Sequence, residues 1–223
     1  MKRIVSLVGK IVLMMLLVGC GGNGAVSPSG GDIRIHQPGE QILDKGEALR
    51  FLEEGNKRFV QDKGISRTTN SEDREILSEG QKPFAVVVTC ADSRVTPEMF
   101  FDQKLGDIFV IRNAGNIADY SALGSIEYAV EHLHVPLVVV VGHSMCGAVS
   151  GALSGGAFPE NLQQVIDEIN LSLDGSENLQ DAIYSNIEAV CTKIRENQIV
   201  AATGATVVGA YYDIKTGEVT FSN

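Results

Sequence analysis

The chain has 223 residues, of which 44% are apolar and 21% charged, with a formal net charge of −10. This length holds one α/β domain with a sizeable core but not two, and the composition excludes an intrinsically disordered chain. So acidic a surface repels nucleic acid, and no cluster of Lys and Arg offsets it, so we expect no nucleic-acid partner.

The N-terminus has the pattern of a secretory signal. Lys2 and Arg3 precede an apolar run over residues 11–18, which ends at Gly19 and Cys20. A basic start, a short apolar stretch and small residues at its end are typical of a cleaved signal, and the stretch is too short to span a membrane comfortably. We therefore expect a signal peptide over residues 1–19.

The end of that apolar run suggests a lipid anchor. Leu17-Val18-Gly19-Cys20 resembles the lipobox of bacterial lipoproteins, in which the cysteine is acylated and becomes the first residue. We expect an exported protein, periplasmic or in the cell envelope, attached to a membrane through Cys20. A plain cleaved signal is the alternative. Gly- and Ser-rich sequence follows, and we expect a flexible tether over residues 20–44.

Residues 45–223 alternate between β-branched apolar runs and helical patterns, so we expect one catalytic domain there. Spacing of apolar residues predicts an amphipathic helix over 46–62, followed by a polar loop. Further helices are expected at 121–132, 146–153, 160–171 and 177–197, buried strands at 84–89, 107–111 and 135–141, and a C-terminal hairpin at 206–214 and 218–221. This alternation indicates a single α/β domain with a mostly parallel central sheet flanked by helices.

Two polar segments directly follow predicted strands. They are Cys90-Ala91-Asp92-Ser93-Arg94 and His143-Ser144-Met145-Cys146. In open α/β sheets, ligand sites form outside the carboxyl ends of the strands, so both segments are expected at one edge. Cys90, His143 and Cys146 offer two thiolates and an imidazole, the donors that Zn²⁺ prefers. Three protein ligands leave a fourth position open, which predicts a catalytic zinc site.

Asp92 and Arg94 complete this predicted site. Two thiolates cancel the formal charge of Zn²⁺, so a bound water is acidified less strongly than at a three-histidine site and needs help from a neighbour. Asp92, two residues after a ligand, is placed to accept the hydrogen bond of that water. Arg94 can keep the carboxylate ionised and aimed through a paired contact. We therefore predict both as catalytic residues.

The joint pattern resembles the β class of carbonic anhydrases, over roughly residues 45–223. Beyond the two segments above, three more stretches resemble that family in the family's order, namely residues 54–59, 111–116 and 209–213. The resemblance implies reversible hydration of CO₂ to bicarbonate on a zinc ion held by Cys90, His143 and Cys146. It also implies that Asp92 and Arg94 form the catalytic pair.

The same resemblance implies further features of the site. The backbone amide of Gly147 is a candidate donor to bicarbonate, and Val95 is a candidate apolar wall for CO₂. The family also implies a homodimer, often paired into tetramers, with the active site near the subunit interface. Some members close the site with the carboxylate that matches Asp92, and they usually carry an aromatic residue where this chain has Val87. We therefore expect an open site.

Two other functions fit the same motifs. The site could hydrolyse CS₂ or COS instead of hydrating CO₂, or the zinc could be structural in a non-catalytic surface lipoprotein. The presence of Asp92 and Arg94 argues against a purely structural zinc. We expect the remaining Cys, His and Asn side chains to have structural roles. Cys191 is expected to be a buried core thiol, and Asn113 and Asn116 to shape a loop. His132 and His134 are expected at a helix end, and His36 in the tether.

Overall fold

The computed structural model describes residues 34–65, 69–173, 175–176 and 178–222. One compact unit covers Arg34–Asn223. The expected signal peptide over residues 1–19, the anchor at Cys20 and the tether as far as residue 33 lie outside the described residues. Among the helices of the described part, none has the length and apolar character needed to cross a membrane.

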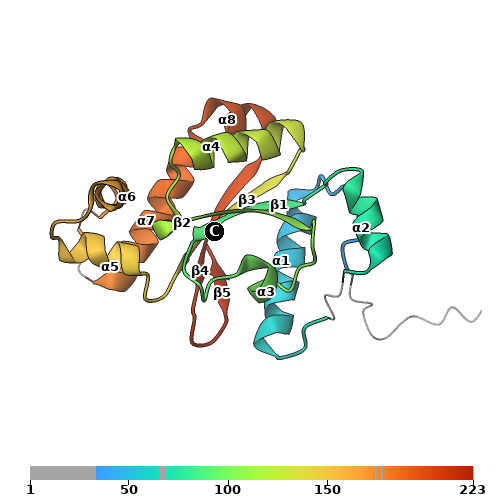
Figure 1. Ribbon diagram of the computed structural model, residues 1–223, viewed down its shortest axis with the longest axis horizontal. Helices are drawn as coiled ribbons and strands as arrows, with labels where there is room; N and C mark the ends of the chain where they lie inside the picture. The colour runs from blue at the N-terminus through green and yellow to red at the C-terminus, as the bar shows by residue number, and fades with distance from the viewer. Residues whose placement is uncertain (1–33, 66–68, 174, 177, 223) are drawn as a thin grey trace, which may run out of the picture. The chain divides into compact units, whose positions relative to one another are not determined.

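Five strands form one sheet in the order β2-β1-β3-β4-β5 (Figure 1). Four of them run parallel, namely β1 (Ala85–Cys90), β2 (Ile108–Asn113), β3 (Leu137–His143) and β4 (Thr206–Tyr212). The last strand, β5 (Val219–Phe221), pairs antiparallel with β4. Every residue of β1 and β3 is buried, because these strands lie inside a sheet that is covered on both faces. The mostly parallel α/β fold and the C-terminal hairpin are confirmed.

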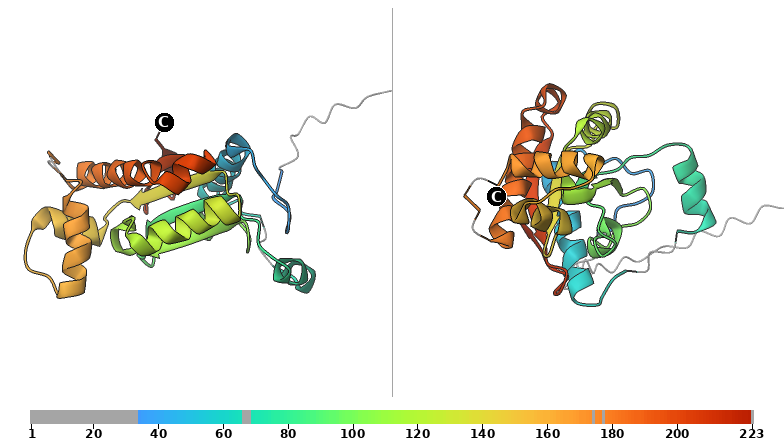
Figure 2. Two further views of the ribbon diagram at one scale, coloured as in Figure 1. Left: turned by 90° about the horizontal axis from the view of Figure 1, so that it is seen from above. Right: turned by 60° about the vertical axis from the view of Figure 1, so that its left-hand side comes forward.

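Helices lie on both faces of the sheet (Figure 1). One face is covered by α1 (Lys45–Val60) and α3 (Pro97–Phe100), and the other by α4 (Tyr120–Glu127), α7 (Leu179–Arg195) and α8 (Gln198–Thr203). A π-helical turn (Tyr128–His132) continues α4. Two further helices, α5 (Gly147–Ser154) and α6 (Glu160–Asn170), pack together at one end of the sheet (Figure 2).

The strands contribute to two apolar cores because successive side chains point to opposite faces of the sheet. Val86 and Val88 of β1 pack with the core that includes α7, whereas Ala85 and Val87 pack with the core that includes α1. The same alternation runs through β3. The two cores hold the middle of the sheet rigidly, so the carboxyl ends of β1 and β3 form a fixed edge.

One helix, α2 (Ser71–Ser78), lies in the stretch expected to be a polar loop. It has no buried residue, so it lacks the apolar stripe by which helical periodicity is recognised. Its N-terminus is instead stabilised by a reciprocal cap: Asp73 donates its backbone N–H to the side chain of Asn70, and the side chain of Asp73 accepts from the backbone of Asn70. The short helices α3 and α8 were likewise not expected.

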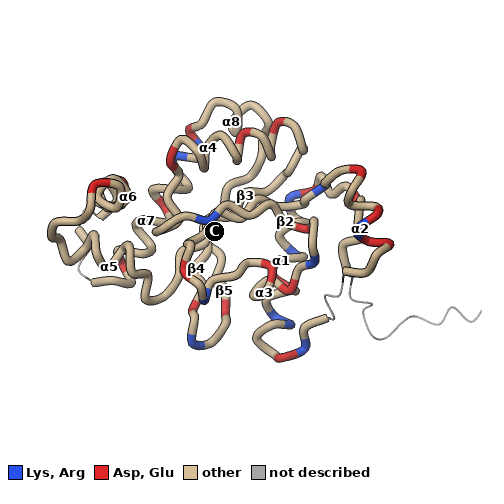
Figure 3. Tube along the Cα trace, viewed as in Figure 1, with Lys and Arg blue, Asp and Glu red and all other residues tan. Residues whose placement is uncertain are grey.

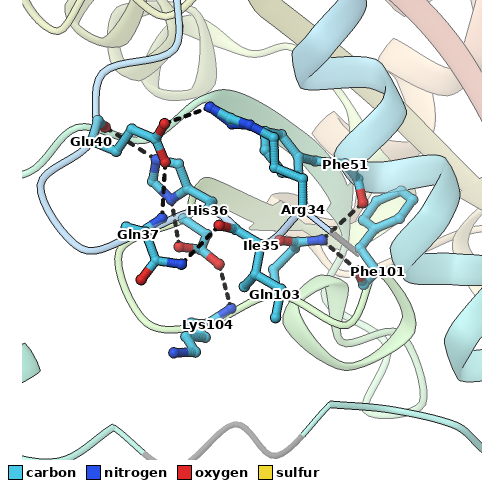
Figure 4. A network of polar contacts seen from close by, with 10 residues as sticks. Arg34, Ile35, His36, Gln37, Glu40, Phe51, Phe101, Gln103 and Lys104 are labelled. Atoms are coloured by element: carbon cyan, nitrogen blue, oxygen red, sulfur yellow. Dashed lines mark hydrogen bonds and ion pairs between the residues drawn. The ribbon is translucent and has the colours of Figure 1, made fainter. Parts of the chain in front are cut away.

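Residues 34–44 pack against the domain, so the compact unit begins earlier than the boundary expected between residues 44 and 45. His36 and Ile42 are only 2% and 3% exposed. The His36 ring lies edge-on to Phe84, with 5.2 Å between centroids, and Figure 4 shows it enclosed by polar partners from two parts of the chain. His36 is therefore a core residue and not part of a free tether.

Asn56 joins the first helix to the C-terminal hairpin. Its side-chain amide donates to the carbonyl oxygens of Phe100 and Gly217, at 2.9 and 2.8 Å. Its Oδ1 accepts from the backbone N–H of Val219 at 2.9 Å. Asn56 is 5% exposed, and a buried amide is stable only when its donors and acceptor are paired. One side chain thus links α1, α3 and β5.

Candidate metal centre

The sheet brings the three predicted ligands together. Cys90 ends β1, His143 ends β3, and Cys146 immediately precedes α5. Because β1 and β3 are parallel neighbours, their last residues lie at the same edge. The Cys and His donor atoms all lie within 4.8 Å of one another, and all three residues are buried.

One ring nitrogen of His143 has no hydrogen-bond partner. Its Nδ1 lies 2.9 Å from the carbonyl oxygen of Ser144, and a carbonyl oxygen can only accept, so Nδ1 carries the proton. Nε2 therefore holds a free lone pair, and it is buried without a hydrogen-bond partner. A buried acceptor without a partner is costly unless it has a ligand. A metal ion fits this position, because the proton on Nδ1 fixes the tautomer that leaves Nε2 free to bind.

The two thiols are coupled. The pKa of Cys90 is lowered, chiefly because the Cys146 thiol donates a hydrogen bond to its thiolate. The pKa of Cys146 is raised, since losing its proton would break that bond and leave two adjacent thiolates in a buried site. A divalent cation would offset that repulsion. Two thiolates and one imidazole match the ligand types that zinc prefers.

Two hydrogen bonds to the end of β4 and the residues just after it fix the turn that carries His143 and Cys146. The backbone N–H of Ser144 donates to the carbonyl oxygen of Tyr212, and the Ser144 hydroxyl accepts from the backbone of Ile214, both at 2.9 Å. Between the two ligands, Met145 has a φ of +59° and a side chain that is 70% exposed. The turn therefore buries the His143 and Cys146 side chains on either side of one residue, Met145, that is held in the unfavourable left-handed conformation.

Asp92 and Arg94 form a two-pronged pair. Arg94 donates from Nε and Nη2 to the two carboxylate oxygens of Asp92, at 2.9 and 2.8 Å, and its backbone N–H also donates to Asp92 at 2.9 Å. This guanidinium holds the pKa of Asp92 well below its usual range. The carboxylate pairs with Arg94 and is not part of the Cys-His-Cys donor group.

Arg112 was not predicted as a site residue. Within the five described strands it is the only Lys, Arg, Asp or Glu, whereas the other charges lie on helices and loops (Figure 3). Its Nη2 donates to the carbonyl oxygen of Asp92 at 2.7 Å, and its Nε donates to that of Cys90 at 3.2 Å. Arg112 thus braces the backbone of the segment that carries both residues. A charge in an otherwise apolar strand was the available sequence signal.

The loop after β2 also reaches the site. The backbone N–H of Gly115 donates to the sulfur of Cys90 at 3.4 Å. Two further buried atoms without partners lie nearby, Oδ1 of Asn113 at the end of β2 and Nδ2 of Asn116 in this loop, and the remaining such atom in the described chain is His143 Nε2. In the described residues, the buried side-chain atoms that lack a hydrogen-bond partner therefore all lie near this edge of the sheet.

The remaining predicted residues lie as follows. Val95 is completely buried beside the Asp92 turn, to which its backbone N–H donates at 3.0 Å. Gly147 is exposed, with open space where a side chain would lie. Cys191 is fully buried, and burial raises its thiol pKa to about 12, as expected of a core residue. His132 and His134 lie before β3, at the opposite end of that strand from His143.

A mostly parallel sheet with a Cys-His-Cys group at the carboxyl ends of two parallel strands, and an adjacent Asp–Arg pair, defines a candidate metal-dependent enzyme. The family model for carbonic anhydrase matches residues 85–219. Carbonic anhydrase 2 of Mycobacterium tuberculosis is 53% identical over 184 residues, covering 76% of this chain and 89% of that protein. The carbonic anhydrase of Mycolicibacterium smegmatis is 36% identical, covering 77% and 90%.

Solved structures agree with these sequence relatives. The β-carbonic anhydrase CcaA superposes with a TM-score of 0.63 at 29% identity, covering 78% of this chain and 95% of that one. A tetrameric β-carbonic anhydrase of Sordaria macrospora gives a TM-score of 0.63 at 27% identity, covering 78% and 96%. The chain belongs to the carbonic anhydrase family, a family of carbonate dehydratases, and within it to the β class.

Proposed function

We propose that this chain catalyses the reversible hydration of CO₂ to bicarbonate and a proton, with Zn²⁺ bound by Cys90, His143 and Cys146. Two observations support the metal most directly: Nε2 of His143 is buried without a hydrogen-bond partner, and a ring nitrogen of His143 and the two thiol sulfurs all lie within 4.8 Å of one another. Membership of the carbonic anhydrase family supports the substrate.

When bound, zinc lowers the pKa of water and so supplies a nucleophile near neutral pH. The side chains and backbone of the protein orient the reacting groups. Asp92 accepts a hydrogen bond from the attacking water, and Arg94 keeps the carboxylate ionised and correctly oriented through its two hydrogen bonds. Val95, the residue that the family resemblance implies as an apolar wall for CO₂, is completely buried in the described chain and presents no exposed surface there. The backbone N–H of Gly147, at the start of α5, donates to the bicarbonate product.

A homodimer, or a tetramer built from dimers, is part of this proposal. In the described sheet, β2 is an edge strand that pairs only with β1, and its apolar residues 108–111 are half-buried rather than covered. An apolar edge of this kind favours pairing with a second copy. The tetrameric relative from Sordaria macrospora supports assembly. Light scattering on the purified chain tests it, and a monomer at micromolar concentration would contradict it.

We further propose export and attachment to a membrane through an acylated Cys20, with the enzyme in the periplasm or cell envelope. The lipobox-like sequence before Cys20 supports this proposal. Replacing Cys20 with Ser should release the protein from the membrane fraction and leave CO₂ hydration unchanged. Continued attachment of the Cys20→Ser protein would contradict the anchor.

Stopped-flow CO₂ hydration, with zinc quantified on the same sample, tests the activity. Asp92→Asn should retain zinc and lose activity by about 10²- to 10⁴-fold, because the neutral amide is a poor proton acceptor. Asp167→Asn on α6 is a matched control with expected normal rates. Near-normal turnover of Asp92→Asn would remove Asp92 from the mechanism. Assaying CS₂ on the same protein separates the alternative substrate.

A further inference from the structure

The Cys90 sulfur accepts a hydrogen bond from a loop that is itself under conformational constraint. Gly115, whose N–H donates to that sulfur, has a φ of +71°, and the next residue, Asn116, has a φ of +47°. The positive φ favours glycine at this position, and a Cβ on Gly115 would also lie 2.6 Å from Cδ1 of Ile169, which would have to move. Two successive left-handed residues hold their shape only with outside support.

That support comes from a helix far along the chain. Asn186 of α7 donates from Nδ2 to the carbonyl oxygen of Gly115 at 2.9 Å. Its Oδ1 has only a long contact, 3.5 Å, with the hydroxyl of Ser172. The bond to Gly115 is therefore the main polar interaction of this side chain.

The position of Asn186 makes this bond unusual. The residue is 2% exposed and lies between Ile183 and Ile187 on the face of α7 that packs on the sheet, where the other buried positions are apolar or Cys. An amide buried among isoleucines is costly without a partner. The fold therefore places a polar side chain in an apolar layer where it reaches the loop that contacts Cys90.

We infer that Asn186 is a positioning residue for the metal centre, acting through Gly115 to keep a backbone N–H aimed at the Cys90 sulfur. The inference rests on the proposed function, because it takes Cys90 as a metal ligand. A hydrogen bond to a ligating thiolate disperses its charge and fixes its direction, and such outer partners affect metal affinity about 10- to 100-fold when lost.

Cobalt substitution provides the test, since Co²⁺ replaces zinc and its thiolate bonds give a sulfur-to-cobalt charge-transfer band. Asn186→Leu removes the donor and roughly keeps the side-chain volume. Asn186→Ala removes the donor with a smaller side chain, so it carries no risk of overpacking. Both should shift the band to longer wavelength, because a sulfur without its hydrogen bond gives up electrons more easily. Both should also weaken Co²⁺ binding by about tenfold.

Two controls separate positioning from general destabilisation. Ile194→Val removes a buried methylene group from the same helix, and Ser172→Ala removes the long contact to Asn186 but leaves its bond to Gly115. Neither should move the band. Bands and affinities of both Asn186 variants equal to those of Ile194→Val would overturn the inference. A parent protein lacking the thiolate band altogether would overturn the proposed metal site, and this inference with it.

Discussion

The Nδ1 atom of His36 lies 2.8 Å from a carboxylate oxygen of Asp107, and both side chains are almost completely buried. The second ring nitrogen, Nε2, lies 3.1 Å from the carbonyl oxygen of Glu40. Both partners only accept, so both ring nitrogens donate and the imidazole is positively charged (Figure 4). Burial alone would lower the pKa of His36, but the hydrogen bond and charge of Asp107, with smaller help from Glu40, raise it.

This pair should make stability depend on pH. Because the folded-state pKa of His36 is raised, its stabilisation is fully present below the unfolded value of about 6.5 and is lost as pH rises through the folded value. His36→Gln should therefore lower the free energy of unfolding more at about pH 6 than at about pH 9. Urea denaturation across this range measures the difference, with the exposed His132→Gln as control. An equal loss at both ends would show that His36 is neutral in the folded protein.

Gly55 should be irreplaceable. It lies within α1 where the helix meets α3, and a Cβ there would lie 1.7 Å from the carbonyl oxygen of Phe101. Because the obstacle is backbone, Gly55→Ala should cost at least about 3 kcal/mol. Gly124→Ala, on an exposed face of α4 with nothing near the new Cβ, should instead gain up to about 1 kcal/mol. Thermal unfolding compares the two. Equal effects would contradict the close helix contact.

The left-handed conformation of Met145 should carry a measurable strain. Its side chain is exposed, so replacing it removes little packing. Met145→Gly should raise the free energy of unfolding by about 0.5 to 1 kcal/mol, whereas Met145→Ala, which keeps the Cβ, should not. Denaturant titration of the zinc-loaded protein measures both. A glycine variant no more stable than the alanine variant would show that the turn is unstrained.

The two-pronged geometry of Arg94 should matter more than its charge. A lysine keeps the charge but cannot donate in parallel to both oxygens of Asp92. Arg94→Lys should reduce kcat/KM for CO₂ by roughly 10- to 100-fold with zinc retained, because a carboxylate misplaced by about an ångström loses its alignment. Arg195→Lys, at an ion pair on α7, is the control. Unchanged kcat/KM in Arg94→Lys would reduce the role of Arg94 to its charge alone.

The parts of the fold that sequence predicted best are those buried on both faces. β1 and β3 are continuous apolar runs, because parallel strands in the middle of a covered sheet have no solvent side. The parts that it missed leave no periodic signal. No residue of α2 is buried, and residues 34–44 are anchored by His36 and Ile42, two side chains too far apart in sequence to form a pattern.

The candidate site likewise contains residues that the sequence could predict and residues that it could not. Cys90, His143 and Cys146 could be placed together because the carboxyl ends of neighbouring parallel strands share an edge. The contact of the Gly115 N–H with the Cys90 sulfur could not be predicted, because a backbone group gives no residue-specific signal in the sequence. Asn186 lies 71 residues from Gly115, and only the packing of α7 on the sheet brings the two together.

The three hydrogen bonds of Asn56 have a consequence for cooperativity. They bind the first helix and the last strand of the described chain to one amide, so neither end can fray without breaking buried bonds of the other. Native-state hydrogen exchange should then report a common opening free energy for the amides of α1 and β5. Elements separated by more than 150 residues would in that case open and close as one foldon.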